Sequence, residues 1–128
     1  MENIQCWARL RTSVNVPLRR GGWYRVISHS RLEAIVHVEG AKPVSVPRPY
    51  LDIRTERPGE WTVLRDPPVA TRTPFAFRRG YLVCPGCSER VPLPQSHVQE
   101  QLCPRCNHIF PIAWSEHYLE GMSEGMSA

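Results

Sequence analysis

Cys84-Pro85-Gly86-Cys87 and Cys103-Pro104-Arg105-Cys106 are two C-x-x-C pairs, separated by fifteen residues, that use four of the chain's five cysteines. A C-x-x-C turn presents two sulfurs to one metal ion, and two such turns at this separation are typical of four-thiolate zinc sites. We therefore expect Cys84, Cys87, Cys103 and Cys106 to bind one zinc ion. Four thiolates fill the coordination shell and leave no position for water, so we expect a structural rather than a catalytic site.

Histidine ligands and a bound iron ion are alternatives to a four-cysteine zinc site. His97 and His108 lie near the second pair in the sequence, but four thiolates already complete the shell. Iron accepts the same four sulfurs in rubredoxin-like sites, and the short segment between the two pairs favours zinc. The fifth cysteine, Cys6, stands beside Trp7, and we expect it to be a small buried hydrophobic residue.

Length and composition limit the fold. The chain has 128 residues, which suits one average domain or two small ones that each need extra support. Its 13 prolines favour short strands and turns over long helices. No apolar run approaches the roughly 18 residues of a membrane span, and the polar start does not resemble a secretory signal. We expect a cytoplasmic protein, in which reduced thiols are free to bind metal.

Charge is distributed unevenly along the chain. Residues 1–80 contain 14 Lys or Arg against 7 Asp or Glu, whereas residues 81–128 contain 2 against 5. A basic front half suggests an anionic partner. Fifteen of the 16 basic residues are arginine, so genome composition and a merely solvated surface are competing explanations.

Five short strands are predicted in the front half. Residues 4–10, 23–28, 32–38, 44–46 and 61–64 carry alternating apolar, aromatic or β-branched residues separated by turn residues such as Gly21-Gly22. Five strands in about 65 residues, without a helix, indicate a small barrel. The fold class expected for the whole chain is mostly β.

Two stretches strengthen the barrel prediction. Gly22-Trp23-Tyr24-Arg25-Val26 and Val46-Pro47-Arg48-Pro49-Tyr50-Leu51 resemble segments of SH3-like barrels, including the KOW and Tudor-like modules. The resemblance implies a short helical turn before the last strand and a role in binding nucleic acid or polymerase. The chain lacks the acidic, aromatic-rich loop with which SH3 domains grip polyproline, so that role is not expected.

Residues 81–114 resemble a zinc ribbon, with both cysteine pairs in turns between short strands. So few residues cannot bury a self-sufficient core, and metal binding is expected to supply much of the folding free energy. The expected organisation is a barrel over residues 1–65, a Pro/Arg-rich linker over 66–80, the ribbon over 81–114 and a flexible tail over 115–128. In the linker, Phe75 and Phe77 either pack on a domain surface or stack on bases together with the neighbouring arginines.

No catalytic motif accompanies the full metal shell, because G-x-S-x-G, Walker and H-E-x-x-H patterns are missing from the sequence. We therefore expect a non-enzymatic module that binds nucleic acid or a nucleic-acid machine such as RNA polymerase or the ribosome. The alternative is a protein–protein adaptor without nucleic-acid contact. Arg90, Arg105 and His108 form an additional candidate contact face on the ribbon. The candidate binding residues of the front half and linker are Arg19, Arg20, Trp23, Tyr24, Arg25, Arg48, Tyr50, Phe77, Arg78 and Arg79.

Overall fold

The computed structural model describes residues 5–12, 14–65, 75–116 and 118, except for the side chain of Phe75. Within these residues it contains ten β-strands and two short 3-10 helices, which confirms the prediction of a mostly β protein. In the same ranges, no helix has the length and apolar character needed to span a membrane.

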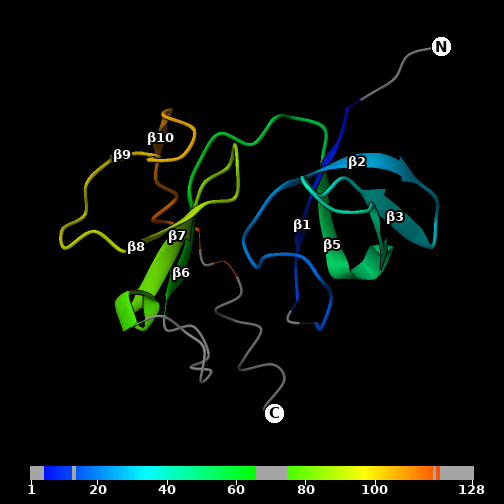
Figure 1. The fold of residues 1–128 in the computed structure, drawn as a ribbon, viewed down its shortest axis with the longest axis horizontal. Helices are drawn as coiled ribbons and strands as arrows, with labels where there is room; N and C mark the ends of the chain where they lie inside the picture. The colour runs from blue at the N-terminus through cyan, green and yellow to red at the C-terminus, as the bar shows by residue number, and fades with distance from the viewer. Residues whose placement is uncertain (1–4, 13, 66–74, 117, 119–128) are drawn as a thin grey trace.

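The front half forms one antiparallel sheet of five strands, with the order β4-β3-β2-β1-β5. These strands lie together at the right of Figure 1. Their bounds are β1 (Trp7–Leu10), β2 (Tyr24–His29), β3 (Glu33–Val36), β4 (Val44–Pro47) and β5 (Leu51–Arg54).

A 3-10 turn, η1 (Arg48–Tyr50), connects β4 to β5. It begins after Pro47, and Leu51 donates its backbone N–H to the carbonyl of Arg48 as the chain extends into the last strand. The helical turn predicted at this place is therefore confirmed. The sheet is not closed, since no pairing between β4 and β5 is found among the strands of residues 5–65, and the closed barrel expected from sequence is corrected to an open sheet.

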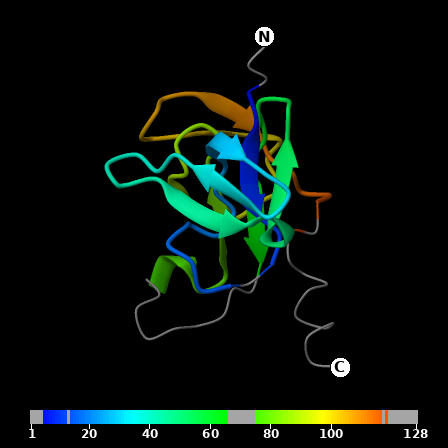
Figure 2. The same cartoon turned by 90° about the vertical axis from the view of Figure 1, so that its right-hand side faces the viewer.

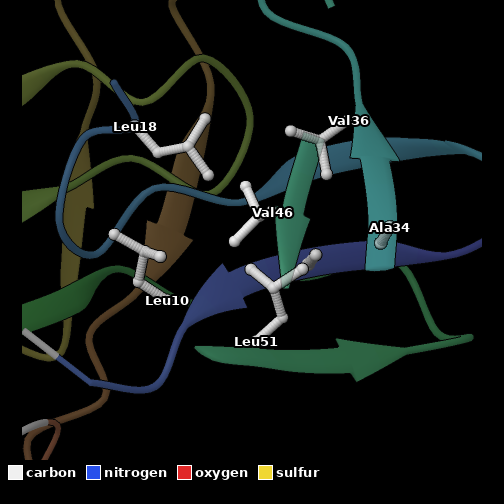
Figure 3. Close-up of a cluster of buried hydrophobic side chains, with 7 residues drawn as sticks. Leu10, Leu18, Ala34, Val36, Val46 and Leu51 are labelled. Carbon is white, nitrogen blue, oxygen red and sulfur yellow. The ribbon is translucent and has the colours of Figure 1, made fainter. Parts of the chain in front are cut away.

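One face of this sheet carries the first hydrophobic core. Ala8 and Leu10 point to this face from β1, and Ala34, Val36 and Val46 are fully buried or nearly so on the neighbouring strands. In Figure 3, Val46 and Leu51 point toward each other near the centre of the cluster. Because successive residues of a strand point to opposite faces, Trp7 and Arg9 lie on the other face of β1.

The C-terminal strands form a second unit, at the left of Figure 1. Three antiparallel strands have the order β6-β7-β8, with β6 (Thr62–Arg65), β7 (Gly80–Val83) and β8 (Arg90–Pro92). A two-stranded sheet joins β9 (Glu100–Leu102) to β10 (Ile109–Pro111).

The fifth strand predicted for the front half belongs to this second unit. The strand forms as β6, but it pairs with β7 from Thr62↔Val83 to Arg65↔Gly80. Just before it, Trp61 is 0% exposed, bridges Ile112 and donates its indole N–H to the carbonyl of Gln101 at 2.9 Å. The buried tryptophan directly before β6 packs in the same core as Leu82 and Ile112, so this second unit includes residues from before the linker.

The second core surrounds the cysteine pairs. Trp61, Val63 and Leu82 pack together with Cys84 and Cys103, all of them 0% exposed. The cysteines therefore contribute to the apolar core as well as to the expected metal site.

Close backbone packing joins the two units. The loop between β1 and β2 carries Gly21, whose φ of +87° suits glycine, and a Cβ built there would lie 2.8 Å from Leu64 Cδ1 and 3.0 Å from Val83 Cγ2. A Cβ on Gly22 would lie 2.8 Å from Ser88 Oγ. The glycine pair predicted as a turn is thus also the place where the front loop contacts β6, β7 and the first cysteine turn. Figure 2, in which the five-stranded sheet faces the viewer, shows the second unit directly behind it.

A buried arginine forms the second contact between the units. Arg9 is 5% exposed and donates to Thr62 Oγ1 at 3.0 Å and to both carboxylate oxygens of Glu116 at 3.1 and 2.8 Å. Its guanidinium lies over the rings of Trp23 and Tyr118, 4.5 and 4.3 Å from their centroids. Such a charge is retained inside only because it is paired and hydrogen-bonded.

The start of the segment expected to be a flexible tail is docked. Tyr118 is 7% exposed, accepts the backbone N–H of Gly21 at 3.1 Å and donates its hydroxyl to the carbonyl of Leu10. Burial raises the pKa of this phenol to about 12, which favours the protonated form that donates this hydrogen bond. Glu116 and Tyr118 therefore correct the tail prediction, whereas residues 119–128, and residues 66–74 of the expected linker, lie outside the described residues.

Candidate metal centre and basic groove

The four predicted cysteines meet in one cluster. Cys84 Sγ lies 3.7 Å from Cys106 Sγ, and Cys87 Sγ lies 3.5 Å from Cys103 Sγ. All four sulfurs are within 4.8 Å of one another. A tetrahedron with zinc–sulfur bonds of about 2.3 Å has edges of about 3.8 Å, so the cluster has the dimensions needed to hold one metal ion.

The two cysteine turns have the same backbone geometry. Ser88 and Asn107, each directly after the second cysteine of its pair, have φ values of 64° and 63°. Their N–H groups donate to the carbonyls of Cys84 and Cys103 at 3.0 and 2.9 Å. The matching φ values and hydrogen bonds show that the two pairs end in the same kind of turn.

The rest of each turn is fixed by local hydrogen bonds. The N–H of Gly86 donates to Cys84 Sγ at 3.3 Å, and the N–H of Cys106 donates to Cys103 Sγ at 3.5 Å. N–H···S bonds of this kind stabilise the thiolate form that binds metal.

Burial and hydrogen bonding shift the pKa values of the cysteine thiols in the cluster. Burial raises the pKa of the Cys84 thiol, and it raises the pKa of Cys87 to about 11. At Cys103, the raising effect of burial is outweighed by hydrogen bonds from the backbone of Cys106 and Arg105, which lower the pKa. Metal binding must therefore displace protons from the thiols whose pKa is raised, and metal affinity should fall as pH falls.

The two histidines weighed as further ligands lie outside the cluster. Within the described ranges, the four cysteines are the group of potential metal ligands that comes together here. His97 stacks on Trp114 with ring centroids 4.0 Å apart, and His108 lies 6.0 Å from the ring of Phe110. The ligand set predicted from sequence is thus the one that the structure assembles.

A groove of about 640 Å³ separates the first cysteine turn from the five-stranded sheet. Pro85, Gly86 and Cys87 line one side, and residues of β1, β2 and the loop between them line the other. The cysteine turns therefore form part of the wall of this groove as well as the metal cluster.

Four arginines from different segments line the groove: Arg19 before β2, Arg25 on β2, Arg57 between β5 and β6, and Arg105 in the second cysteine turn. Arg19 donates to the carbonyl of Ser88 and so helps to join the units. Arg105 lies 3.5 Å from the exposed carboxylate of Glu39. Arg25 and Arg57 have no side-chain partner among the residues that the structure describes. Arg25 and Arg57 are consequently the two groove arginines whose guanidinium groups are available to an anion without loss of a contact to a described residue.

Aromatic side chains also line the groove. Tyr24 is half-buried, packs against the first core and accepts the backbone N–H of Arg19 at 2.7 Å. Trp7 is half-buried and faces Arg25 across the β1–β2 pair. Trp23, a predicted stacking residue, is 8% exposed and its ring is already covered by Arg9 and Arg54. Its burial removes Trp23 from the candidate stacking surface.

The remaining predicted binding residues of the front half lie away from the groove. Arg48 donates to the carbonyl of Ser30 at 2.8 Å and contacts His29 Nδ1 at 3.2 Å, which holds the β2–β3 turn. Tyr50 is 37% exposed at the end of η1, and Arg20 is half-buried beside Gly21. These residues do not join Arg25 and Arg57 in one surface.

For Phe77, the structure supports packing on a domain surface rather than stacking on bases. It lies in η2 (Phe75–Phe77), packs against the cluster of Leu64, Tyr81 and Val83, and its ring lies 5.5 Å from that of Tyr81. Arg90 covers the Phe77 ring at 5.0 Å. Phe77 thus packs on a domain surface, while Arg78 and Arg79 are exposed in the turn that follows.

Sequence reasoning missed two groove residues, Trp7 and Arg57. Trp7 falls in the strand predicted over residues 4–10 without a binding motif of its own, and Arg57 lies in a polar connection without a motif. The available signal was the alternation in β1, which places Trp7 and Arg9 on the face opposite Ala8 and Leu10. Strand register then decides that Trp7 lies opposite Arg25, and register cannot be read from one strand alone.

Comparisons with models of protein families, with curated proteins and with solved structures found no match to this chain.

Proposed function

We propose that this protein is a non-enzymatic, zinc-binding module that binds nucleic acid, as an accessory factor of a nucleic-acid machine such as RNA polymerase or the ribosome. One observation carries the proposal. Guanidinium groups from three separate segments, those of Arg25, Arg57 and Arg105, rim a groove between the two units.

A phosphodiester backbone suits this arrangement better than an acidic side chain does. Phosphates repeat along a strand, and arginine binds them through two parallel N–H···O bonds. Three guanidiniums at separate points of one groove match such a repeated charge. Contacts of this kind position the ligand and read little sequence.

The donor set supports zinc as the metal. Four thiolates suit a soft, tetrahedral site, and bound zinc would supply a cross-link between the two cysteine turns. Pro85 and Gly86 from the first turn and Arg105 from the second then keep their places in the groove wall. The expected role of the metal is therefore to hold a binding surface.

Salt dependence tests the proposal. Fluorescence anisotropy with labelled DNA and RNA oligonucleotides, single-stranded and duplex, should show binding at low salt that weakens steeply as salt rises, because counterions are released from the phosphates. The double variant Arg25→Ser/Arg57→Ser should reduce the slope of log K against log [salt] by roughly 1.4–1.8, at about 0.7–0.9 per lost phosphate contact.

A matched variant separates the groove from overall charge. Arg11→Ser/Arg31→Ser removes the same two positive charges from exposed positions that do not line the groove. This variant should keep a slope close to that of the wild type. Equal losses in the two double variants would contradict a role for the groove, and no binding to any oligonucleotide at low salt would overturn the proposal.

One observation favours the second candidate, a protein–protein adaptor. The cross-strand partners Leu102 and Ile109 of the two-stranded sheet are 46% and 61% exposed. Apolar pairs of this kind are more typical of protein contacts than of phosphate contacts. An adaptor without nucleic-acid contact would give no anisotropy change in the same titration, so the experiment distinguishes the two functions.

A further inference from the structure

We infer that the groove takes single-stranded rather than duplex nucleic acid, with a base against Trp7 and the adjoining phosphates on Arg25, Arg57 and Arg105; this rests on the proposed function. The first argument is shape. The groove is a recess of about 640 Å³ between two units, within the size range of sites that enclose small molecules. A duplex presents its phosphates on a convex outer surface with its bases stacked inside, whereas a single strand can turn one base into a recess.

The register of the sheet places a stacking group directly beside a phosphate-binding group. Trp7 on β1 is the Cα partner of Arg25 on β2, and paired residues of neighbouring strands project to the same face. Trp7 is half-buried and lines the groove, so part of its surface stays accessible there. Proteins that bind single strands combine aromatic platforms with a basic groove, and this cross-strand pair supplies both.

The charges on this face divide into two groups. Arg9 and Arg54 are both paired with Asp52 and Glu116, and their guanidiniums cover the ring of Trp23. Arg25, on the other neighbour of β1, has no such partner among the described side chains. Asp52 and Glu116 therefore neutralise Arg9 and Arg54 where the two units join. In the groove the acidic residue Glu39 pairs with Arg105, which leaves Arg25 and Arg57 unpaired among the described side chains.

The opposite wall completes the recess. Arg105 reaches it from the second cysteine turn, where its exposed ion pair with Glu39 can exchange for a phosphate at little cost. Arg57 reaches it from the connection between β5 and β6. Cations from several segments around one recess are expected where a phosphate backbone passes a bound base.

The test compares a fluorescein-labelled ten-nucleotide oligo-dT and oligo-U with a ten-base-pair DNA duplex and the corresponding RNA duplex, at one salt concentration. We expect the single strands to bind at least tenfold more tightly than the duplexes. Trp7→Leu should weaken single-strand binding by roughly 5- to 100-fold through lost stacking and leave the salt slope unchanged. Tyr50→Leu, which removes an exposed aromatic ring outside the groove, should bind like the wild type.

A second measurement does not depend on the folding of a variant. Ultraviolet cross-linking of wild-type protein to an oligonucleotide that carries 5-iodouracil, followed by peptide mapping, should place the adduct on Trp7 or Tyr24. Duplex binding equal to or tighter than single-strand binding, or an adduct confined to residues outside the groove, would overturn this inference and leave the proposed function standing. Absence of binding to every probe would overturn the proposed function as well.

Discussion

The two units are stabilised in different ways. The five-stranded sheet has an ordinary apolar core, in which Ala8, Val36 and Val46 are 0% exposed. The second unit has short strands and builds its core from Trp61 together with cysteines that form the expected metal site. The first unit is therefore stabilised by burial of apolar area, whereas we expect the second to depend also on a metal cross-link that a chelator could remove.

This difference bears on function because both units form the groove. The sheet supplies Trp7 and Arg25, and the cysteine turns supply Pro85, Gly86 and Arg105. Loss of the metal should therefore damage one wall of the groove while the sheet remains folded.

The largest effect is expected from removing a metal ligand. Cys103→Ser should abolish stable folding of the second unit, because structural zinc supplies roughly 10 kcal/mol or more of apparent folding free energy in such small modules. Elemental analysis should give about one zinc per chain for the wild type and close to none for the variant. NMR spectra should show dispersed amide signals from β1–β5 and collapsed signals from β6–β10.

Two controls complete this experiment. Cys6→Ser changes a cysteine outside the cluster and should leave the metal content at one per chain. Leu51→Ala, in the first core, should cost about 2–5 kcal/mol of stability without changing the metal content. A metal-free wild-type protein with a fully dispersed spectrum would contradict the comparison.

A smaller effect is expected where the units meet. Gly21→Ala should lower the free energy of unfolding by about 2–4 kcal/mol, since it combines a left-handed backbone with contact against Leu64 and Val83. Gly40→Ala has a similar φ of +76° but nothing within 4 Å of the new Cβ, so it should cost about 1 kcal/mol. Chemical denaturation of the two variants measures the difference, and equal losses would show that the Gly21 contact adds nothing to the interface.

The smallest effect concerns the ion pair that joins the units. Burial opposes ionisation of Glu116, but its hydrogen bonds and charge interactions with Arg9 and Arg54 outweigh this and lower its pKa. A lowered folded-state pKa stabilises the protein above the unfolded value of 4.5, and this contribution is lost as pH falls through the folded value. Glu116→Gln should therefore cost about 1–2 kcal/mol at pH 7 and progressively less below about pH 4.

Glu56→Gln, at an exposed carboxylate, serves as the control for this pH series. It should change stability little at either pH. If the difference between wild type and Glu116→Gln persisted undiminished at pH 3, the ion pair would not be its source.

Local pattern was enough to predict several parts of the molecule. The metal ligands could be predicted from the spacing of the two C-x-x-C pairs, because each pair forms a local turn that presents two sulfurs to one metal ion. The helical turn at Arg48–Tyr50 was expected from the resemblance of residues 46–51 to a segment of SH3-like barrels, and the prolines at positions 47 and 49 favour a tight turn there. Most strands could be predicted from the alternation of apolar and polar residues, since successive side chains of a half-buried strand point alternately to the core and to solvent.

Tertiary structure decided the features that depend on partners distant in the chain. The strand at residues 62–65 was predicted, yet only packing shows that it pairs with β7 and that Trp61 fills the core of the cysteine unit. Arg9 was one of many arginines until Glu116, 107 residues away, was found on its guanidinium. Trp7 likewise became a groove residue through its register with Arg25.

The physical reason is the same in each case. The amino-acid sequence determines the ligand set, the strand alternation and the excess of arginine, because these are properties of neighbouring residues. Which arginines are neutralised and which stay free depends on how two small units pack against each other. The cysteine pairs thus specify how the second unit is held together, and the packing of that unit on the sheet creates the basic groove.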